Sequence, residues 1–263
     1  MPDTNGYQDK KAFFDKVLTV YGRKPALEAL ADRNLDCYAL HLASSNRESG
    51  IIAELITLAQ NRGIPVKRHS REELARISKN GRQDQGVCAD IICPSFRSLD
   101  QYLEQLSPSQ PQRLLALDSI SNPQNLGMII RSAAAGTIDG IIWSRKGNAA
   151  LGPLVIKASV GTLYRAPLLL CPSLPLGLHE CQANGFKVYT LDAEAPTTLF
   201  ECRPADKSIY VLGNETEGVA GESAKLADSG QSIPMKNGVE PLNVAVTASL
   251  IAFATDLGGH LER

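Results

Sequence analysis

Short apolar runs recur through the second half of the chain, and segments with helical spacing separate them. RLLALD (113–118), GIIWS (140–144), FKVYTLD (186–192) and SIYVLGN (208–214) are apolar almost throughout. Strands that are apolar on both faces are typical of a parallel sheet covered by helices on either side. The sequence therefore predicts an α/β fold with a mostly parallel sheet in this region.

A smaller α/β pattern precedes this region. SGIIAELITLAQNRG (49–63) has the spacing of a helix with a glycine at its end, and GVCADIIC (86–93) has the character of a strand. FRSLDQYLEQLSPSQPQ (96–112) is polar and ends in a Pro/Ser/Gln cluster, which is typical of a linker. We therefore expect four parts: an N-terminal extension over 1–17, a small domain over 18–95, a linker over 96–112 and a larger domain over 113–263.

The composition sets limits on the partners. The formal net charge is −1, so an RNA or DNA partner would need a local basic face. Six scattered cysteines without CxxC spacing predict buried thiols in a reducing compartment and no metal site. The charged N-terminus and the absence of a run of about 20 apolar residues predict a cytoplasmic protein without a signal peptide or membrane span.

The first of three polar stretches at strand ends is NPQNLGMIIR (122–131). Asn125 could cap the following helix, because Asn accepts hydrogen bonds from backbone N–H groups. Arg131 has small or apolar neighbours, and a guanidinium buried there would need an anionic partner. A helix cap with an internal ion pair and a substrate-binding site both remain open on these residues alone.

The other two stretches are VLGNETEGVAGE (211–222) and IPMKNGVEPLNVAV (233–246). Gly213 and Gly218 would expose backbone groups to a ligand, which suits an adenine or a ribose better than a triphosphate. Asn243 stands where a helix cap is expected. No G-x-G-x-x-G turn follows a strand, and this argues against a nicotinamide-dependent oxidoreductase.

Together and in this order, the three stretches resemble the signature motifs of the SpoU (TrmH) branch of the SPOUT superfamily. Its members are S-adenosylmethionine-dependent RNA 2′-O-ribose methyltransferases. VYGRKPALEAL (20–30) and QDQGVCADI (83–91) also look like parts of the ribosomal-protein-like α/β substrate-binding domain of the members that act on ribosomal RNA. The resemblance implies a trefoil-knotted C-terminal domain, a homodimer, S-adenosyl-L-methionine as cofactor and no metal.

The resemblance also assigns site residues. The catalytic group would be Asn125, Arg131, Glu215 and Asn243. The cofactor would contact Leu212, Gly213, Ile233, Met235, Leu242 and Asn243. RNA would contact Arg131 and, from the charge pattern of the front domain, Arg23, Lys79 and Arg82.

Two departures from the family pattern stand in the third motif, where Pro241 and Ala245 replace serines. Because the other motif residues are retained, we expect the activity to survive. The front domain favours ribosomal RNA as the substrate. The alternatives are a transfer-RNA ribose methyltransferase and a non-catalytic RNA-binding or ribosome-assembly protein of the same fold.

Overall fold

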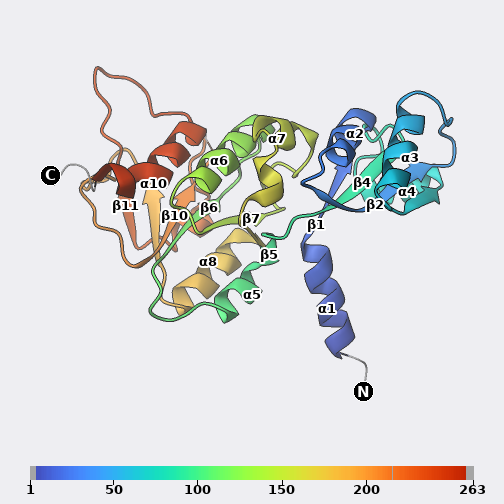
Figure 1. Cartoon of the computed structure of the whole chain (residues 1–263). Helices are drawn as coiled ribbons and strands as arrows, with labels where there is room; N and C mark the ends of the chain where they lie inside the picture. The colour runs from blue at the N-terminus through green and yellow to red at the C-terminus, as the bar shows by residue number, and fades with distance from the viewer. Residues whose placement is uncertain (1–3, 215, 259–263) are drawn as a thin grey trace. The chain divides into compact units, whose positions relative to one another are not determined.

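The computed structural model describes residues 4–214 and 216–258. The chain forms two compact units (Figure 1). The first comprises the residues up to Pro94 together with Leu151–Ile156, and the second comprises the remainder. Within the described residues, no helix is both long enough and apolar enough to cross a membrane.

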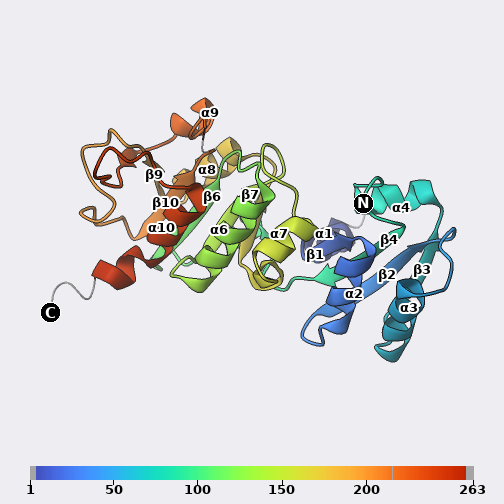
Figure 2. The same ribbon diagram turned by 90° about the horizontal axis from the view of Figure 1, so that it is seen from above.

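The first unit is built on a four-stranded sheet with the order β1-β4-β2-β3. Its pairs β1·β4 and β2·β4 are antiparallel, and β2·β3 is parallel. Helices α2 and α3 cover one face of the sheet and α4 lies on the other (Figure 2). The elements are α1 (Thr4–Asp15), β1 (Val17–Tyr21), α2 (Arg23–Ala31), β2 (Asp36–Ala43), α3 (Ile51–Asn61), β3 (Val66–His69), α4 (Arg71–Ser78) and β4 (Val87–Ile92).

The second unit contains a seven-stranded sheet with the order β11-β9-β10-β6-β7-β8-β5, and every pair in it is parallel. The predicted parallel α/β fold is therefore confirmed. Its elements, with α7 beginning among residues of the first unit, are β5 (Arg97–Ser98), α5 (Leu99–Glu104), β6 (Gln112–Leu117), α6 (Pro123–Ala135), β7 (Gly140–Ser144), α7 (Pro153–Ala158), the 3₁₀ helix η1 (Thr162–Arg165), β8 (Leu168–Cys171), α8 (Leu174–Ala183), β9 (Lys187–Leu191), β10 (Lys207–Leu212), α9 (Gly221–Ala224), β11 (Ser229–Gln231) and α10 (Val244–Gly258).

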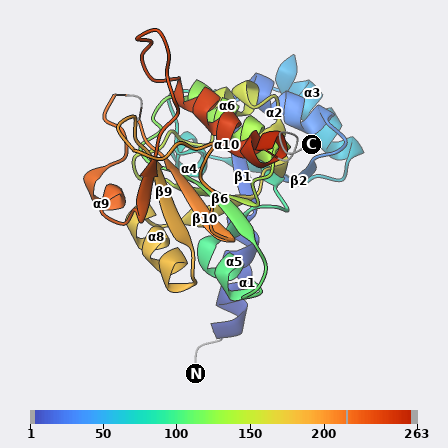
Figure 3. The same ribbon diagram turned by 90° about the vertical axis from the view of Figure 1, so that its left-hand side faces the viewer.

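Both faces of this sheet are buried. On one face, Leu114 and Val211 pack with residues of α5 and α8 in a continuous apolar core. Helices α6 and α10 pack together over the other face (Figure 3). Gly136, at the end of α6, lies so close to α10 that an added Cβ would be 2.5 Å from the carbonyl oxygen of Ala252. These two helices therefore have one closely fitted arrangement.

The strand order reverses its direction of growth between β6 and β10. From β6 the chain adds β7 and β8 on one side, and then it crosses to build β9, β10 and β11 on the other. In open α/β sheets, ligands bind outside the carboxyl ends of the strands at such a switch point. The fold therefore predicts a ligand site at the loops that follow β9, β10 and β11.

The segment expected to be a linker, 96–112, is instead part of the second unit. Its strand β5 pairs with β8, and Leu99, Tyr102 and Leu103 of α5 are buried in the core. The Tyr102 hydroxyl donates a hydrogen bond to the side-chain oxygen of Gln112. The apolar residues of this helix are few and its polar flanks dominate the composition, so the sequence pattern resembled a linker.

The N-terminal extension expected over 1–17 is helical in its described part. Helix α1 covers Thr4–Asp15, and β1 begins at Val17. Phe13 of α1 packs edge-on against Tyr38 of β2, with ring centroids 5.0 Å apart. The end of this helix is therefore in contact with the sheet of the first unit.

Replacement of Leu99 by Ala tests the role of α5. Leu99 is fully buried, so the change should lower the free energy of unfolding of the second unit by about 2–5 kcal/mol through lost burial and a residual cavity. Urea unfolding followed by the fluorescence of Trp143, the single tryptophan and a residue of the same sheet, measures the effect. Glu104→Ala, at an exposed site in the same helix, is the control. An unchanged midpoint for Leu99→Ala would show that α5 is not part of the core.

Candidate active site

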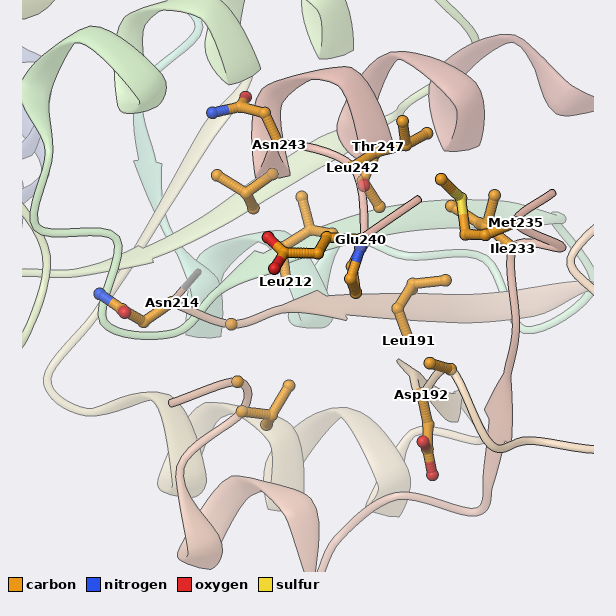
Figure 4. Close-up of a pocket in the computed structure, with 16 residues that line it drawn as sticks. Leu191, Asp192, Leu212, Asn214, Ile233, Met235, Glu240, Leu242, Asn243 and Thr247 are labelled. Atoms are coloured by element: carbon orange, nitrogen blue, oxygen red, sulfur yellow. The ribbon is translucent and has the colours of Figure 1, made fainter. Parts of the chain in front are cut away.

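A pocket of about 460 Å³ opens at the carboxyl ends of β9, β10 and β11. Its volume lies in the range typical of small-molecule sites. Its walls come from three loops and from the start of α10 (Figure 4). The lining includes all six residues that were expected to contact a cofactor: Leu212, Gly213, Ile233, Met235, Leu242 and Asn243.

The loop after β10 folds back on itself beside this pocket. Asn214 and Gly218 exchange two backbone hydrogen bonds, of 3.0 and 2.8 Å, and Gly218 has a φ of +70°. A Cβ on Gly213 would lie 2.1 Å from the carbonyl carbon of Gly218. No side chain other than hydrogen fits at Gly213 in this arrangement, so the glycine of the second motif is required by backbone contact.

Asp118 holds the same loop from the neighbouring strand. It follows β6 and is buried, and its carboxylate accepts a hydrogen bond of 2.9 Å from the backbone N–H of Ala220. Its own N–H donates to the carbonyl of Leu212. Asn214 donates from its side chain to the carbonyl of Ser119, 3.2 Å away. Asp118 is not among the residues predicted from the motifs, although it is a polar residue directly after an apolar strand.

The Asn243 side chain joins the third motif to the first. Its Oδ1 accepts a hydrogen bond of 2.8 Å from the N–H of Ala245, which caps α10 as expected. Its Nδ2 donates to Oδ1 of Asn125, 3.3 Å away and 118 positions earlier in the chain. The structure therefore brings together two of the predicted catalytic residues, Asn125 and Asn243.

Asn125 does not cap α6, contrary to the expectation. The cap is Asn122, whose side chain accepts a hydrogen bond of 2.8 Å from the N–H of Gln124. Pro123 occupies the first position of the helix, where its missing N–H costs nothing. Asn125 consequently lies inside the first turn, where its side chain is buried and reaches Asn243.

Arg131 is exposed on α6, whereas its apolar neighbours had suggested a buried guanidinium. It lines an open depression of about 560 Å³ between α6 and α10, together with Met128, Val246 and Asn243. No ion pair involves Arg131 within residues 4–214 and 216–258. Because Asn243 lines both the depression and the pocket, the two are adjacent.

One predicted catalytic residue, Glu215, lies outside the described residues. Two other carboxylates that the sequence analysis did not single out line the pocket: those of Asp192 and Glu240. The Glu240 carboxylate points across the pocket toward Leu212 and Asn214, whereas Asp192 points away from Glu240 (Figure 4). Asp192 directly follows β9. A polar residue directly after an apolar strand is the signal from which it could have been identified.

The predicted RNA-contacting residues of the first unit gather at one end of its sheet. Arg23 begins α2, its N–H donates to Gln85, and its guanidinium donates to Asn46 over 3.3 Å. Lys79 caps the end of α4, and Arg82 follows in the turn that leads to β4; both are exposed. Arg68, a basic residue of β3, pairs with Glu48.

The described residues provide neither a metal-binding site nor a reactive thiol at this pocket. Among them, no group of three or more His, Cys, Asp or Glu side chains is arranged to hold a metal ion. The described lining of the pocket contains no cysteine. Burial raises the pKa of Cys88, Cys93, Cys171 and Cys181 to about 12, so these thiols stay protonated.

The chain is similar to proteins whose structures are known. The SpoU methyltransferase AviRb from Streptomyces viridochromogenes, solved in complex with the cofactor AdoMet, is 19% identical with a TM-score of 0.62, and the match covers 100% of this chain and 96% of that one. An AdoMet-bound rRNA methyltransferase from Sinorhizobium meliloti is 18% identical with a TM-score of 0.62, covering 97% and 90% of the two chains. At these identities the likeness shows a shared fold.

Sequence comparison extends this result. An uncharacterized tRNA/rRNA methyltransferase from Mycolicibacterium vanbaalenii is 31% identical over 238 residues, which are 90% of this chain and 75% of that one. The model of the RNA 2′-O ribose methyltransferase substrate binding family matches residues 19–95. The model of the SpoU rRNA Methylase family matches residues 112–253, more than half of the chain. The resemblance inferred from the three motifs is thus confirmed, and the chain belongs to the SpoU rRNA Methylase family.

Proposed function

We propose that this protein transfers a methyl group from S-adenosyl-L-methionine to a ribose 2′-hydroxyl of RNA, and that the RNA is ribosomal. The observation that carries the proposal is the pocket at the switch point of the sheet. Six residues assigned to cofactor binding line it, and Asn243 connects it to Asn125 on α6. The match of residues 19–95 to a substrate-binding family supports an RNA substrate.

The pocket suits the cofactor chemically. Leu212, Ile233 and Leu242 provide apolar contacts for an adenine ring, and Gly213 leaves the backbone accessible. The carboxylate of Glu240 lies across the pocket, where it complements a positively charged ligand (Figure 4). When bound, S-adenosyl-L-methionine supplies an electrophilic methyl group on a positively charged sulfur.

The residues of the first motif would position the RNA. Arg131 would bind a phosphate and orient the ribose. The proton of the 2′-hydroxyl would leave to solvent as the oxygen–methyl bond forms and the sulfur–methyl bond breaks. The exposure of Arg131 in this chain leaves it available for a phosphate contact. Asn125, fixed by Asn243, holds the start of α6 against the cofactor pocket. Alignment of the hydroxyl with the methyl group then provides much of the rate.

Homodimer formation is part of the proposal. Met128 and Val246 are large apolar side chains, 42% and 48% exposed, on the adjoining helices α6 and α10. An apolar depression of this kind is typical of a protein interface. A two-fold pairing of this face would place Asn125 and Arg131 of one copy near the cofactor of the other. We also infer that the loops after β10 and β11 form the trefoil knot that the family resemblance implies.

Methyl transfer to unmodified ribosomal RNA and transfer RNA, measured side by side with a labelled cofactor, tests the function. We expect label in ribosomal RNA at one alkali-resistant dinucleotide, and a loss of roughly 100-fold or more in Arg131→Ala, because positioning effects are of this size. Wild-type protein, with Pro241, should be active without a Pro241→Ser change. Label in transfer RNA alone would overturn the substrate assignment. If the protein bound cofactor and RNA but labelled neither RNA, it would be a non-catalytic protein of this fold.

Gly213→Ala tests the pocket. The added Cβ would clash with the backbone of Gly218, so the loop must move, and affinity for S-adenosyl-L-methionine should fall roughly tenfold or more. Isothermal titration calorimetry measures this affinity. Gly221→Ala is the matched control, since a Cβ at Gly221 meets nothing within 4 Å. Equal affinity in the two variants would place the cofactor elsewhere.

The double variant Lys79→Ala/Arg82→Ala tests RNA contact at the end of the first unit's sheet where Arg23, Lys79 and Arg82 gather. If both residues contact phosphates, the slope of log affinity against log salt concentration should become shallower by about 1.5. Fluorescence anisotropy with a ribosomal RNA fragment at several salt concentrations gives this slope. The control is Lys187→Ala/Lys207→Ala, which removes two cations from the strand starts of the second unit. An unchanged slope in the test variant would remove Lys79 and Arg82 from the interface.

A further inference from the structure

A second surface of the first unit has the chemistry of an RNA-binding face. It lies on the α4 side of the sheet, away from α2 and α3, at the end where β2 and β3 begin. We call it the Tyr38 face, and it comprises Phe14 of α1, Tyr38 of β2 and Lys67 of β3. Tyr38 is 39% exposed and Phe14 is 58% exposed, although both are large aromatic residues.

The aromatic and basic side chains of this face contact one another. The Lys67 ammonium lies 5.3 Å from the centroid of the Tyr38 ring. Phe13 packs edge-on against Tyr38 and also against Phe14, whose ring centroid is 5.4 Å from its own. A partly exposed aromatic ring that is held at its edge and has a lysine over it combines a ring on which a base can stack with a positive charge.

Tyr38 owes its position to an irregularity in β2. The pairing of β2 with β4 shifts register between Cys37 and Ala39, so Tyr38 is an extra residue in its strand. Such a bulge changes the direction in which a side chain points, and it is frequent at functional sites. Cys37 faces the helices α2 and α3, since its thiol contacts the carbonyl of Ala29. Tyr38 instead reaches Lys67 and Phe13 on the opposite side.

A buried polar chain beneath this face keeps the carboxylate of Asp90 away from solvent. Asp90 accepts hydrogen bonds from the Thr19 hydroxyl, at 2.7 Å, and from Nε2 of His41, at 3.0 Å. Nδ1 of His41 shares a second hydrogen bond with Nε2 of His69, 2.9 Å away. The charge of Asp90 is thus buried and hydrogen-bonded, and His69 is held in a fixed orientation.

The exposed charges around Tyr38 are mostly positive. The exposed, described charged side chains of α1, of the residue that follows it, of α4 and of this face of β2 and β3 comprise six cations and three carboxylates. The cations are Lys10, Lys11, Lys16, Lys67, Arg71 and Arg76, and the carboxylates are Asp36, Glu72 and Glu73. A cationic surface with exposed aromatic rings is complementary to an unpaired RNA strand, whose bases can stack and whose phosphates can pair with lysines. A base-paired helix would keep its bases away from such rings.

We propose that the Tyr38 face is a second RNA-docking surface that binds an unpaired segment of the substrate RNA, with Tyr38 stacking on a base and Lys67 contacting a phosphate. This inference rests on the proposed function and specifies how the substrate is held. The face is distinct from the end of the sheet at which Arg23, Lys79 and Arg82 gather. Tyr38 lies five residues before Ala43, where β2 reaches that end, and five residues of strand span roughly 17 Å.

Binding of two RNA probes to the full-length protein without cofactor tests the proposal. The probes are a fluorescent 12-nucleotide single strand and a fluorescent 12-base-pair duplex. The fluorescence anisotropy of each probe measures its binding. We expect Tyr38→Ala and Lys67→Ala each to weaken single-strand binding about five- to tenfold or more, and duplex binding less than twofold. Tyr38→Phe, which keeps the ring, should bind within twofold of wild type. Lys207→Ala is the control for Lys67, because Lys207 also lies over an aromatic ring, that of Phe186.

The possible results distinguish RNA binding by the Tyr38 face from the proposed methyltransferase function. Single-strand affinity in Tyr38→Ala equal to that of wild type would overturn it, as would equal losses on both probes or a wild-type protein that binds neither. Equal melting temperatures for Tyr38→Ala and Tyr38→Phe would show that Tyr38→Ala is folded and lacks only the ring. Absence of methyl transfer by wild-type protein would contradict the proposed function, while the comparison of probes would still decide whether this face binds RNA.

Discussion

The close approach of Gly213 to Gly218 is the constraint on which the candidate active site depends. Two backbone hydrogen bonds between Asn214 and Gly218 turn the chain back directly after β10, and Asp118 fixes the far side of the turn through Ala220. A wider loop would run across the end of the strand. Because this one is tight, the carboxyl end of β10 stays open and Leu212 forms part of the pocket wall.

Asn243 has a comparable role for the other half of the site. One side chain caps α10 through its oxygen and reaches Asn125 on α6 through its nitrogen. An amide can do both because it carries a donor and an acceptor on the same short stem. A serine or aspartate could cap the helix equally well. The connection to α6, and through α6 to the surface around Arg131, explains why this position requires the amide.

Much of the second unit could be predicted from the sequence, because strands buried on both faces leave long apolar runs and ligand sites follow their ends. The motif resemblance named six of the residues that line the pocket. Helix α5 was missed since three buried residues, Leu99, Tyr102 and Leu103, are too few to outweigh polar flanks. The exposure of Arg131 was missed because apolar neighbours suggest a core whether they face the protein interior or an open depression.

The two departures in the third motif can be understood from backbone contacts. Ala245 is buried, and it is its N–H, not its side chain, that donates to Asn243. A hydroxyl there would need a partner of its own in the core. Pro241 lines the pocket directly before Leu242, and its ring restricts the backbone of the loop before any ligand binds. The proline lacks the N–H and the hydroxyl of a serine, but its fixed φ lowers the chain entropy that the loop loses when Leu242 and Asn243 are held in place.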